Sequence, residues 1–81
     1  NSMPAITIYS TPTCPFCRQA KDFFGTQGVS FVDYNVAEDE MRREEMIEKT
    51  GQIGEPVIEI GGEIVVGFDQ QRLQALLGKS V

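Results

Sequence analysis

The sequence predicts a small α/β domain with the element order βαβαββα and a mixed four-stranded sheet flanked by helices. Three observations support this prediction. Short β-branched segments alternate with segments whose apolar residues recur at helical spacing. A double glycine, Gly61-Gly62, separates two short apolar segments, as in a two-residue hairpin. The length of 81 residues suits a single domain, which we place at residues 3–81.

The first half of the chain predicts a βαβ unit. Residues 5–9 are rich in β-branched and aromatic side chains, which favours a central strand. A helix is expected from Pro15, because proline is favoured at the first helical position and Thr13 can cap. We expect the helix to end near Gly25 and Gly28, and a second, parallel strand at residues 29–36. In the helix that begins at Pro15, the stripe of residues at helical spacing comprises Phe16, Ala20, Phe23, Phe24 and Gln27.

Residues 38–50 predict a second helix, closed by Gly51. Its apolar face is thin and consists mainly of Met46 and Ile47, with Met41 to one side. Local charge pairs support it instead, because an acidic residue four positions before a basic one stabilises a helix. These pairs are Glu38–Arg42, Asp39–Arg43 and Glu45–Lys49.

The last third predicts a hairpin and a helix. Val57–Ile60 and Glu63–Val66 flank the two glycines, which allow the positive φ angles that a tight hairpin turn requires. Asp69 is expected to cap the final helix, which ends at Gly78. One face of that helix carries Leu73, Leu76 and Leu77.

Composition excludes several classes of function. The net charge is −5, from 12 acidic and 7 basic residues, which argues against nucleic-acid binding and against attachment to anionic membranes. No apolar segment is long enough to span a membrane, and no secretory signal pattern is seen. The chain has two cysteines and no histidine, which excludes a Cys–His hydrolase and a one-chain zinc site. We therefore expect a monomer in the reducing cytoplasm.

The two cysteines, Cys14 and Cys17, form a Cys-x-x-Cys motif with three possible roles. A structural cross-link over so short a loop would contribute only about 2 kcal/mol, and a metal site would need ligands from another chain or a small thiol. Redox exchange is favoured by position. Cys14 lies at a strand-to-helix junction, where free N–H groups and the helix dipole favour a thiolate. Cys17, one turn on, can attack a mixed disulfide on Cys14, so Cys14 is the predicted nucleophile and Cys17 the resolving thiol.

Residues near the cysteines have several possible roles. Pro15 removes a backbone donor and stiffens the turn. Phe16 either packs against a docked substrate or joins the core, and Arg18 and Lys21 either support the thiolate or lie in solvent. Pro56 directly precedes a β segment, where its missing N–H is not needed.

Three blocks of the sequence resemble glutaredoxins. Residues 9–17, Tyr-Ser-Thr-Pro-Thr-Cys-Pro-Phe-Cys, are similar to the family's active site, which usually reads Cys-Pro-Tyr-Cys. Residues 54–58 resemble its Val-Pro segment, and residues 67–69 resemble the segment before its last helix. The blocks follow the family's order and span residues 5–77. The resemblance implies a thioredoxin-like fold with sheet order 2-1-3-4, and a cis Pro56 against the Cys14 sulfur.

The resemblance also implies a function. It predicts a thiol–disulfide oxidoreductase that reduces protein disulfides or glutathione mixed disulfides, with glutathione as co-substrate and no bound cofactor or metal. Electrons would come from the glutathione reductase system or from thioredoxin reductase. The helix-start geometry also suits a carboxylate ligand. The predicted substrate- or glutathione-binding residues are Thr11, Pro15, Phe16, Glu55, Pro56, Gly67, Phe68 and Asp69.

The chain departs from the glutaredoxin pattern at three places. Thr11 replaces a common lysine, and Glu55 replaces a small apolar residue. Val66-Gly67 replaces a Gly-Gly pair and is followed by Phe68, as in redoxins reduced by thioredoxin reductase, including those serving ribonucleotide reductase. These departures concern glutathione use, not dithiol chemistry. The alternatives are such a redoxin, an iron–sulfur carrier in which Cys14 of two chains bridges a cluster, and a non-catalytic binding module.

Overall fold

The computed structural model describes residues 5–78 and has the predicted element order. The two ends of the predicted domain, residues 3–4 and 79–81, lie outside the described residues. The sheet order is β2-β1-β3-β4, with β1 parallel to β2 and antiparallel to β3, and β3 antiparallel to β4. The predicted mixed sheet is thus confirmed. Its elements are β1 Ile6–Ser10, α1 Pro15–Thr26, β2 Val32–Asn35, α2 Glu40–Thr50, β3 Val57–Ile60, β4 Glu63–Val66 and α3 Gln70–Gly78.

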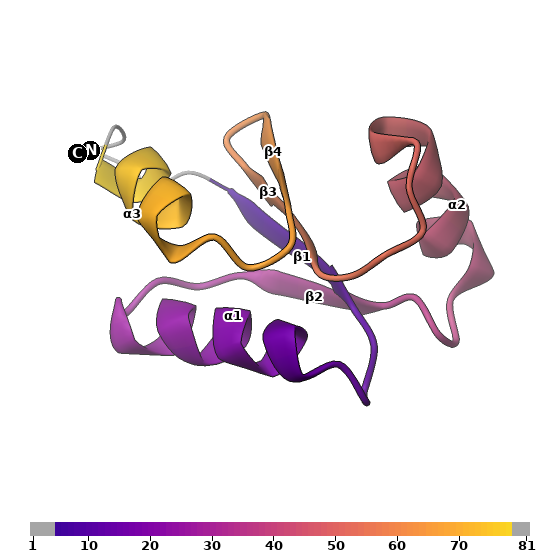
Figure 1. The fold of residues 1–81 in the computed structure, drawn as a ribbon, viewed down its shortest axis with the longest axis horizontal. Helices are drawn as coiled ribbons and strands as arrows, with labels where there is room; N and C mark the ends of the chain where they lie inside the picture. Colours follow the sequence, from indigo (N-terminus) through magenta and orange to yellow (C-terminus); the bar gives the residue numbers. More distant parts are fainter. Residues whose placement is uncertain (1–4, 79–81) are drawn as a thin grey trace.

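Helices cover both faces of the sheet. Helices α1 and α3 share one apolar cluster, and α2 packs into a second, smaller one; Figure 1 shows α2 set apart from the other two helices. Strand β1 serves both clusters because successive side chains alternate: Ile6 and Ile8 face α1 and α3, whereas Tyr9 faces α2. None of the described helices is both long enough and apolar enough to cross a membrane.

Two details of the first predicted helix were wrong. The N-cap is Cys14, not Thr13, because a residue before proline is held extended and Pro15 is already the first helical residue. Phe16 lies outside the core with 58% of its surface exposed, and Cys17 is buried in its place. The strand after this helix is also shorter than predicted. Val29 belongs to the turn that follows α1, because its N–H donates to the Phe24 carbonyl at 3.2 Å.

The second helix starts later than predicted, at Glu40. Asp39 caps it by accepting the Arg42 N–H at 3.1 Å, so this carboxylate does not pair with Arg43. The Arg42 guanidinium pairs with Glu45 at 3.0 Å rather than with Glu38. Gly51 ends the helix in the left-handed conformation, as expected.

The hairpin and last helix agree with the prediction. Gly61 and Gly62 have φ angles of 54° and 92°, and Ile60 pairs with Glu63 across the turn. The Asp69 carboxylate accepts the Arg72 N–H at 3.2 Å and so caps α3. The predicted leucine face is buried: Leu73, Leu76 and Leu77.

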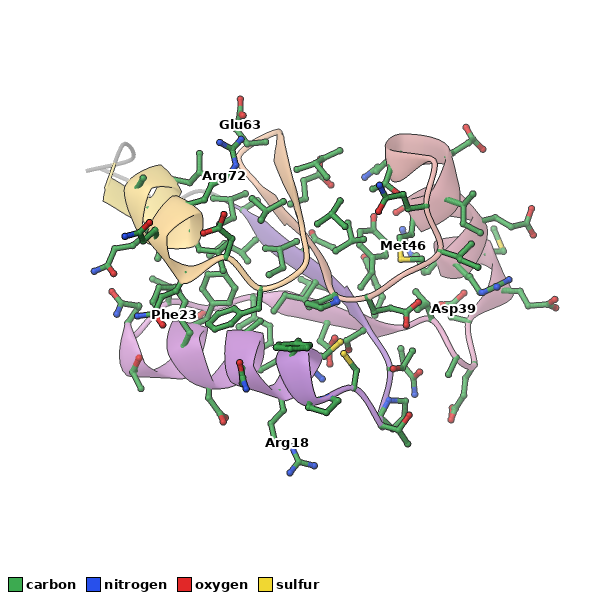
Figure 2. All side chains as sticks on the ribbon, viewed as in Figure 1. Arg18, Phe23, Asp39, Met46, Glu63 and Arg72 are labelled. Carbon is green, nitrogen blue, oxygen red and sulfur yellow. The ribbon has the colours of Figure 1, made fainter. Side chains whose placement is uncertain are left out.

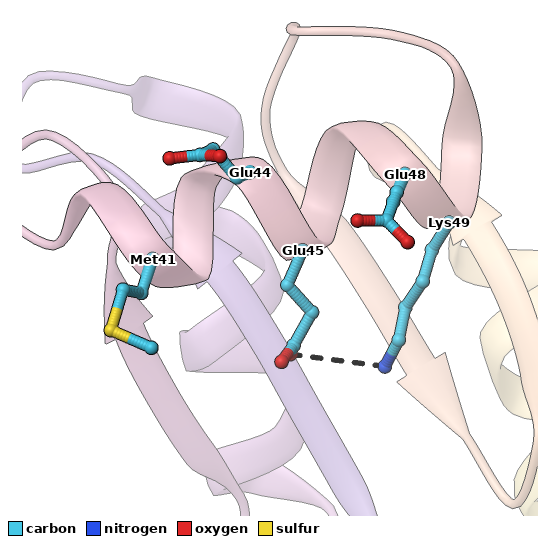
Figure 3. Close-up of a pocket in the computed structure, with 5 residues that line it drawn as sticks. All are labelled: Met41, Glu44, Glu45, Glu48 and Lys49. Carbon is cyan, nitrogen blue, oxygen red and sulfur yellow. Dashed lines mark ion pairs between the residues drawn. The ribbon is translucent and has the colours of Figure 1, made fainter.

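A polar network that the sequence analysis missed ties α2 to the sheet. The Tyr9 hydroxyl lies beneath α2 and donates to the Glu45 carboxylate. Lys49 donates to the Tyr9 oxygen at 3.2 Å and to Glu59 on β3 at 2.8 Å; Figure 3 shows Glu45 and Lys49 side by side on α2. The hydrogen bond from Tyr9 lowers the pKa of Glu45. The network therefore stabilises a helix whose apolar face is thin.

Replacing Tyr9 with phenylalanine is expected to lower the free energy of unfolding by about 1 kcal/mol at neutral pH, the usual loss for one hydrogen bond. Because the pKa of Glu45 is lowered in the folded state, its ionised carboxylate stabilises the fold at pH values above the ordinary glutamate pKa of about 4.3. This stabilisation is lost as the pH falls through the lowered pKa. The difference between wild type and Tyr9→Phe should therefore shrink in acid. Urea unfolding between about pH 3 and pH 7 measures both effects.

Tyr34→Phe is the matched control. The Tyr34 ring lies 5.7 Å from the Tyr9 ring and 4.1 Å from the Arg42 guanidinium carbon. Its hydroxyl has no hydrogen-bond partner among residues 5–78. This variant should be nearly neutral. Equal losses in the two variants would contradict a role for the Tyr9 hydroxyl.

Candidate active site

Cys14 caps helix α1 with its sulfur. The residue has extended backbone angles, φ −98° and ψ 110°, and its Sγ accepts the N–H of Cys17 at 3.1 Å. Serine, threonine, aspartate and asparagine usually fill this position, with an oxygen as acceptor. Both the donated N–H and the positive end of the helix dipole favour negative charge on the capping atom. The Cys14 sulfur therefore lies at the helix start with a backbone donor directed to it.

The two thiols have different surroundings. Both cysteines are free, with Cys14 half-buried and Cys17 only 1% exposed. Burial is the main cause that raises the pKa of Cys17 to about 12, and a hydrogen bond with Cys14 adds to it. Cys17 is thus a protonated, shielded thiol at neutral pH. The more accessible sulfur is that of Cys14.

Two further chain segments meet at the cysteines. The Glu55–Pro56 peptide bond is cis, as the resemblance implied, and Pro56 is buried. The Glu55 carbonyl lies 3.8 Å from the Cys14 sulfur and accepts its S–H. The Gly67 N–H donates to the Pro56 carbonyl at 2.7 Å, which joins the segment before α3 to the proline. Cys14, Glu55, Pro56 and Gly67 therefore form one connected site.

The other predicted binding residues divide into two groups. Thr11 contacts Cys14, since its carbonyl accepts the Cys14 N–H at 3.4 Å, and Pro15 and Phe16 follow Cys14 in the first turn of α1. Phe68 and Asp69 have structural contacts instead. The Phe68 ring packs 6.1 Å from Phe23, and the Asp69 carboxylate caps α3. Contact of any of these residues with glutathione stays a prediction.

Neither nearby cation is directed to the sulfur. Lys21 forms an ion pair with Asp33 at 2.6 Å, and the same carboxylate accepts the hydroxyl of buried Ser10 at 2.6 Å. Arg18 extends away from α1 on its outer side (Figure 2). The sequence pattern could not pair Lys21 with Asp33, because the two residues lie on α1 and β2 and meet only when the helix packs against the sheet. Within the described residues, the backbone N–H of Cys17 is thus the donor to this sulfur.

A shallow pocket on α2 is a separate feature. Figure 3 shows its lining by Met41, Glu44, Glu45, Glu48 and Lys49, with Glu45 and Lys49 at 3.9 Å. It contains no thiol, and α2 covers the sheet face opposite α1. No group of three or more potential metal ligands occurs within residues 5–78. The cysteine site is therefore the candidate for chemistry.

Comparison with known proteins agrees with this geometry. The glutaredoxin family model matches residues 6–65, which includes both cysteines and the cis proline. The chain belongs to the glutaredoxin family. The expected family and its thioredoxin-like fold are thereby confirmed, and membership supports thiol–disulfide oxidoreductase chemistry at the Cys14–Cys17 site.

Relatives of this glutaredoxin-family chain cover nearly all of it. A glutaredoxin-like 8.6 kDa protein in the rubredoxin operon of Clostridium pasteurianum, itself uncharacterized, is 47% identical over 91% of this chain and 99% of its own. Glutaredoxin 3 of Escherichia coli is 36% identical over 83% of this chain and 81% of its own. A glutaredoxin structure from Archaeoglobus fulgidus has a TM-score of 0.80 and 28% identity, over 93% of this chain and 87% of that one.

Proposed function

We propose that this protein is a dithiol oxidoreductase that reduces disulfides through Cys14 as nucleophile and Cys17 as resolving thiol. One observation carries the proposal. The Cys14 sulfur caps α1 and accepts the Cys17 N–H at 3.1 Å, which holds both cysteines at the same helix start. Because one chain contains both cysteines, the proposed enzyme works as a monomer. A reducing compartment such as the cytoplasm suits free thiols.

The order of the reaction steps follows from the different surroundings of the Cys14 and Cys17 thiols. The Cys14 thiolate attacks one sulfur of the substrate disulfide, forms a new S–S bond and releases the other sulfur as a thiolate, which takes a proton. Cys17 then loses its proton to solvent, attacks the Cys14 sulfur and releases the second substrate thiolate. Two electrons pass from the cysteine pair to the substrate. The protein is left with a Cys14–Cys17 disulfide.

The oxidised protein needs a thiol reductant for the next cycle. Glutathione is the proposed co-substrate because the chain is a glutaredoxin, and protein disulfides or glutathione mixed disulfides are the proposed substrates. Thioredoxin reductase is the alternative electron source. Thr11, Glu55 and Phe68 support that alternative, since they occupy positions where glutaredoxins usually have other residues.

Two assays test this proposal. Oxidation with excess hydroxyethyl disulfide should remove both free thiols of the chain as an intramolecular disulfide, without a stable adduct. NADPH consumption should then be measured in two systems, one with glutathione plus glutathione reductase and one with thioredoxin reductase. Electron flow in one system identifies the donor. Two free thiols after oxidation, with no NADPH consumed in either system, would contradict an oxidoreductase.

A further inference from the structure

Glu55 is a charged residue whose backbone lies beside the reactive sulfur. Its carbonyl oxygen lies 3.8 Å from the Cys14 Sγ, and the residue is half-buried. The Glu55 side chain branches from the Cα next to that carbonyl, and its length is less than the Debye length of about 8 Å in physiological salt. Solvent ions therefore screen its charge only partly at Cys14. Burial is the main cause of the raised pKa of Cys17, and the Glu55 charge adds to it.

The described cations do not offset this charge. Four of them are bound by carboxylates, in the pairs Lys21–Asp33, Arg42–Glu45, Lys49–Glu59 and Arg72–Glu63. Arg18 extends outward from α1 (Figure 2). Arg43 belongs to α2, on the opposite face of the sheet from α1. Within residues 5–78, no cation is shown paired with the Glu55 carboxylate, so its charge is not neutralised by an ion pair.

We propose that Glu55 is a specificity residue that makes the site prefer disulfides flanked by neutral or cationic groups over those flanked by carboxylates. This inference rests on the proposed function, because it concerns the substrate of the same cysteines. An anionic disulfide approaching Cys14 must come close to the Glu55 carboxylate, and like charges raise the energy of that encounter. A cationic disulfide gains energy at the same place.

Three small disulfides provide the test. Pre-reduced protein is mixed in single turnover with cystamine, which is cationic, with neutral hydroxyethyl disulfide, and with anionic dithiodipropionate. The neutral compound normalises each variant for the general reactivity of Cys14. Glu55→Gln should lower the cystamine-to-dithiodipropionate rate ratio about tenfold, since one charge changes each rate by about threefold at this range. High salt should shrink the wild-type preference.

Glu63→Gln is the control, because it removes the same charge from the hairpin, where Glu63 pairs with Arg72 at 3.4 Å (Figure 2). It should leave the rate ratio unchanged. An unchanged ratio in Glu55→Gln, or an equal change in Glu63→Gln, would overturn the selectivity while reduction of the neutral disulfide still supports the oxidoreductase. If wild type reduced none of the three compounds, the proposed function would fail, and the selectivity with it.

Discussion

Replacing Cys14 with serine is expected to abolish disulfide reduction, with kcat/KM falling by about 1000-fold or more, as for removal of an enzyme's nucleophile. A serine hydroxyl stays protonated at neutral pH and does not exchange with disulfides. Serine is also a favoured N-cap, so its oxygen can accept the Cys17 N–H that Cys14 accepts at 3.1 Å. The substitution therefore removes the chemistry and keeps the helix start.

Coupled turnover assays with hydroxyethyl disulfide measure this loss. Thermal unfolding of Cys14→Ser should match that of wild type within a few degrees, which separates lost chemistry from lost folding. Alkylation of the native variant by iodoacetamide should be slow, because the remaining thiol, Cys17, is 1% exposed. Undiminished turnover by Cys14→Ser would show that another group attacks the substrate.

Local patterns predicted most of the fold. The Gly61-Gly62 turn and its two flanking strands could be located to the residue, since the preference for positive φ is a property of the turn itself. Helix starts were harder to predict. Thr13 and Cys14 are both side chains that can cap, and only the extended backbone before Pro15 decides between them. Phe16 fits the helical stripe, yet its side chain is largely exposed to solvent.

The candidate site could be predicted only in part, because some of its contacts are local and others join distant segments. Cys14 and Cys17 are three residues apart, so their relation follows from helix geometry. Pro56 required the family resemblance, because its neighbour Glu55 reaches Cys14 only through a contact 41 positions apart in the chain. The ion pair of Lys21 with Asp33 and the network at Tyr9 join separate elements. Pairing of charged side chains between a helix and a strand depends on how the helix packs on the sheet, which sequence spacing does not specify.

Replacing Cys17 with serine is expected to stop the cycle after its first half. Cys14 keeps its position at the start of α1, so attack on a disulfide proceeds, but no second thiol releases the product. Mixed disulfides with a protein substrate such as insulin should accumulate, and release of the reduced product in a single turnover without added thiol should fall about 100-fold. Intact-mass measurement detects the adduct. Cys14→Ser and the double variant should form none.

The resolving step in wild type should also depend on pH. Burial is the first cause of the raised pKa of Cys17, about 12, and burial remains when Cys14 is held in a mixed disulfide. Below that pKa the thiolate fraction of Cys17 rises about tenfold per pH unit, so release of the product should accelerate as pH increases from about 6 to 9. Stopped-flow measurement of release from a preformed adduct tests this slope. Full-rate product release by Cys17→Ser in a single turnover without added thiol, or a resolving rate independent of pH, would contradict the assignment of Cys17.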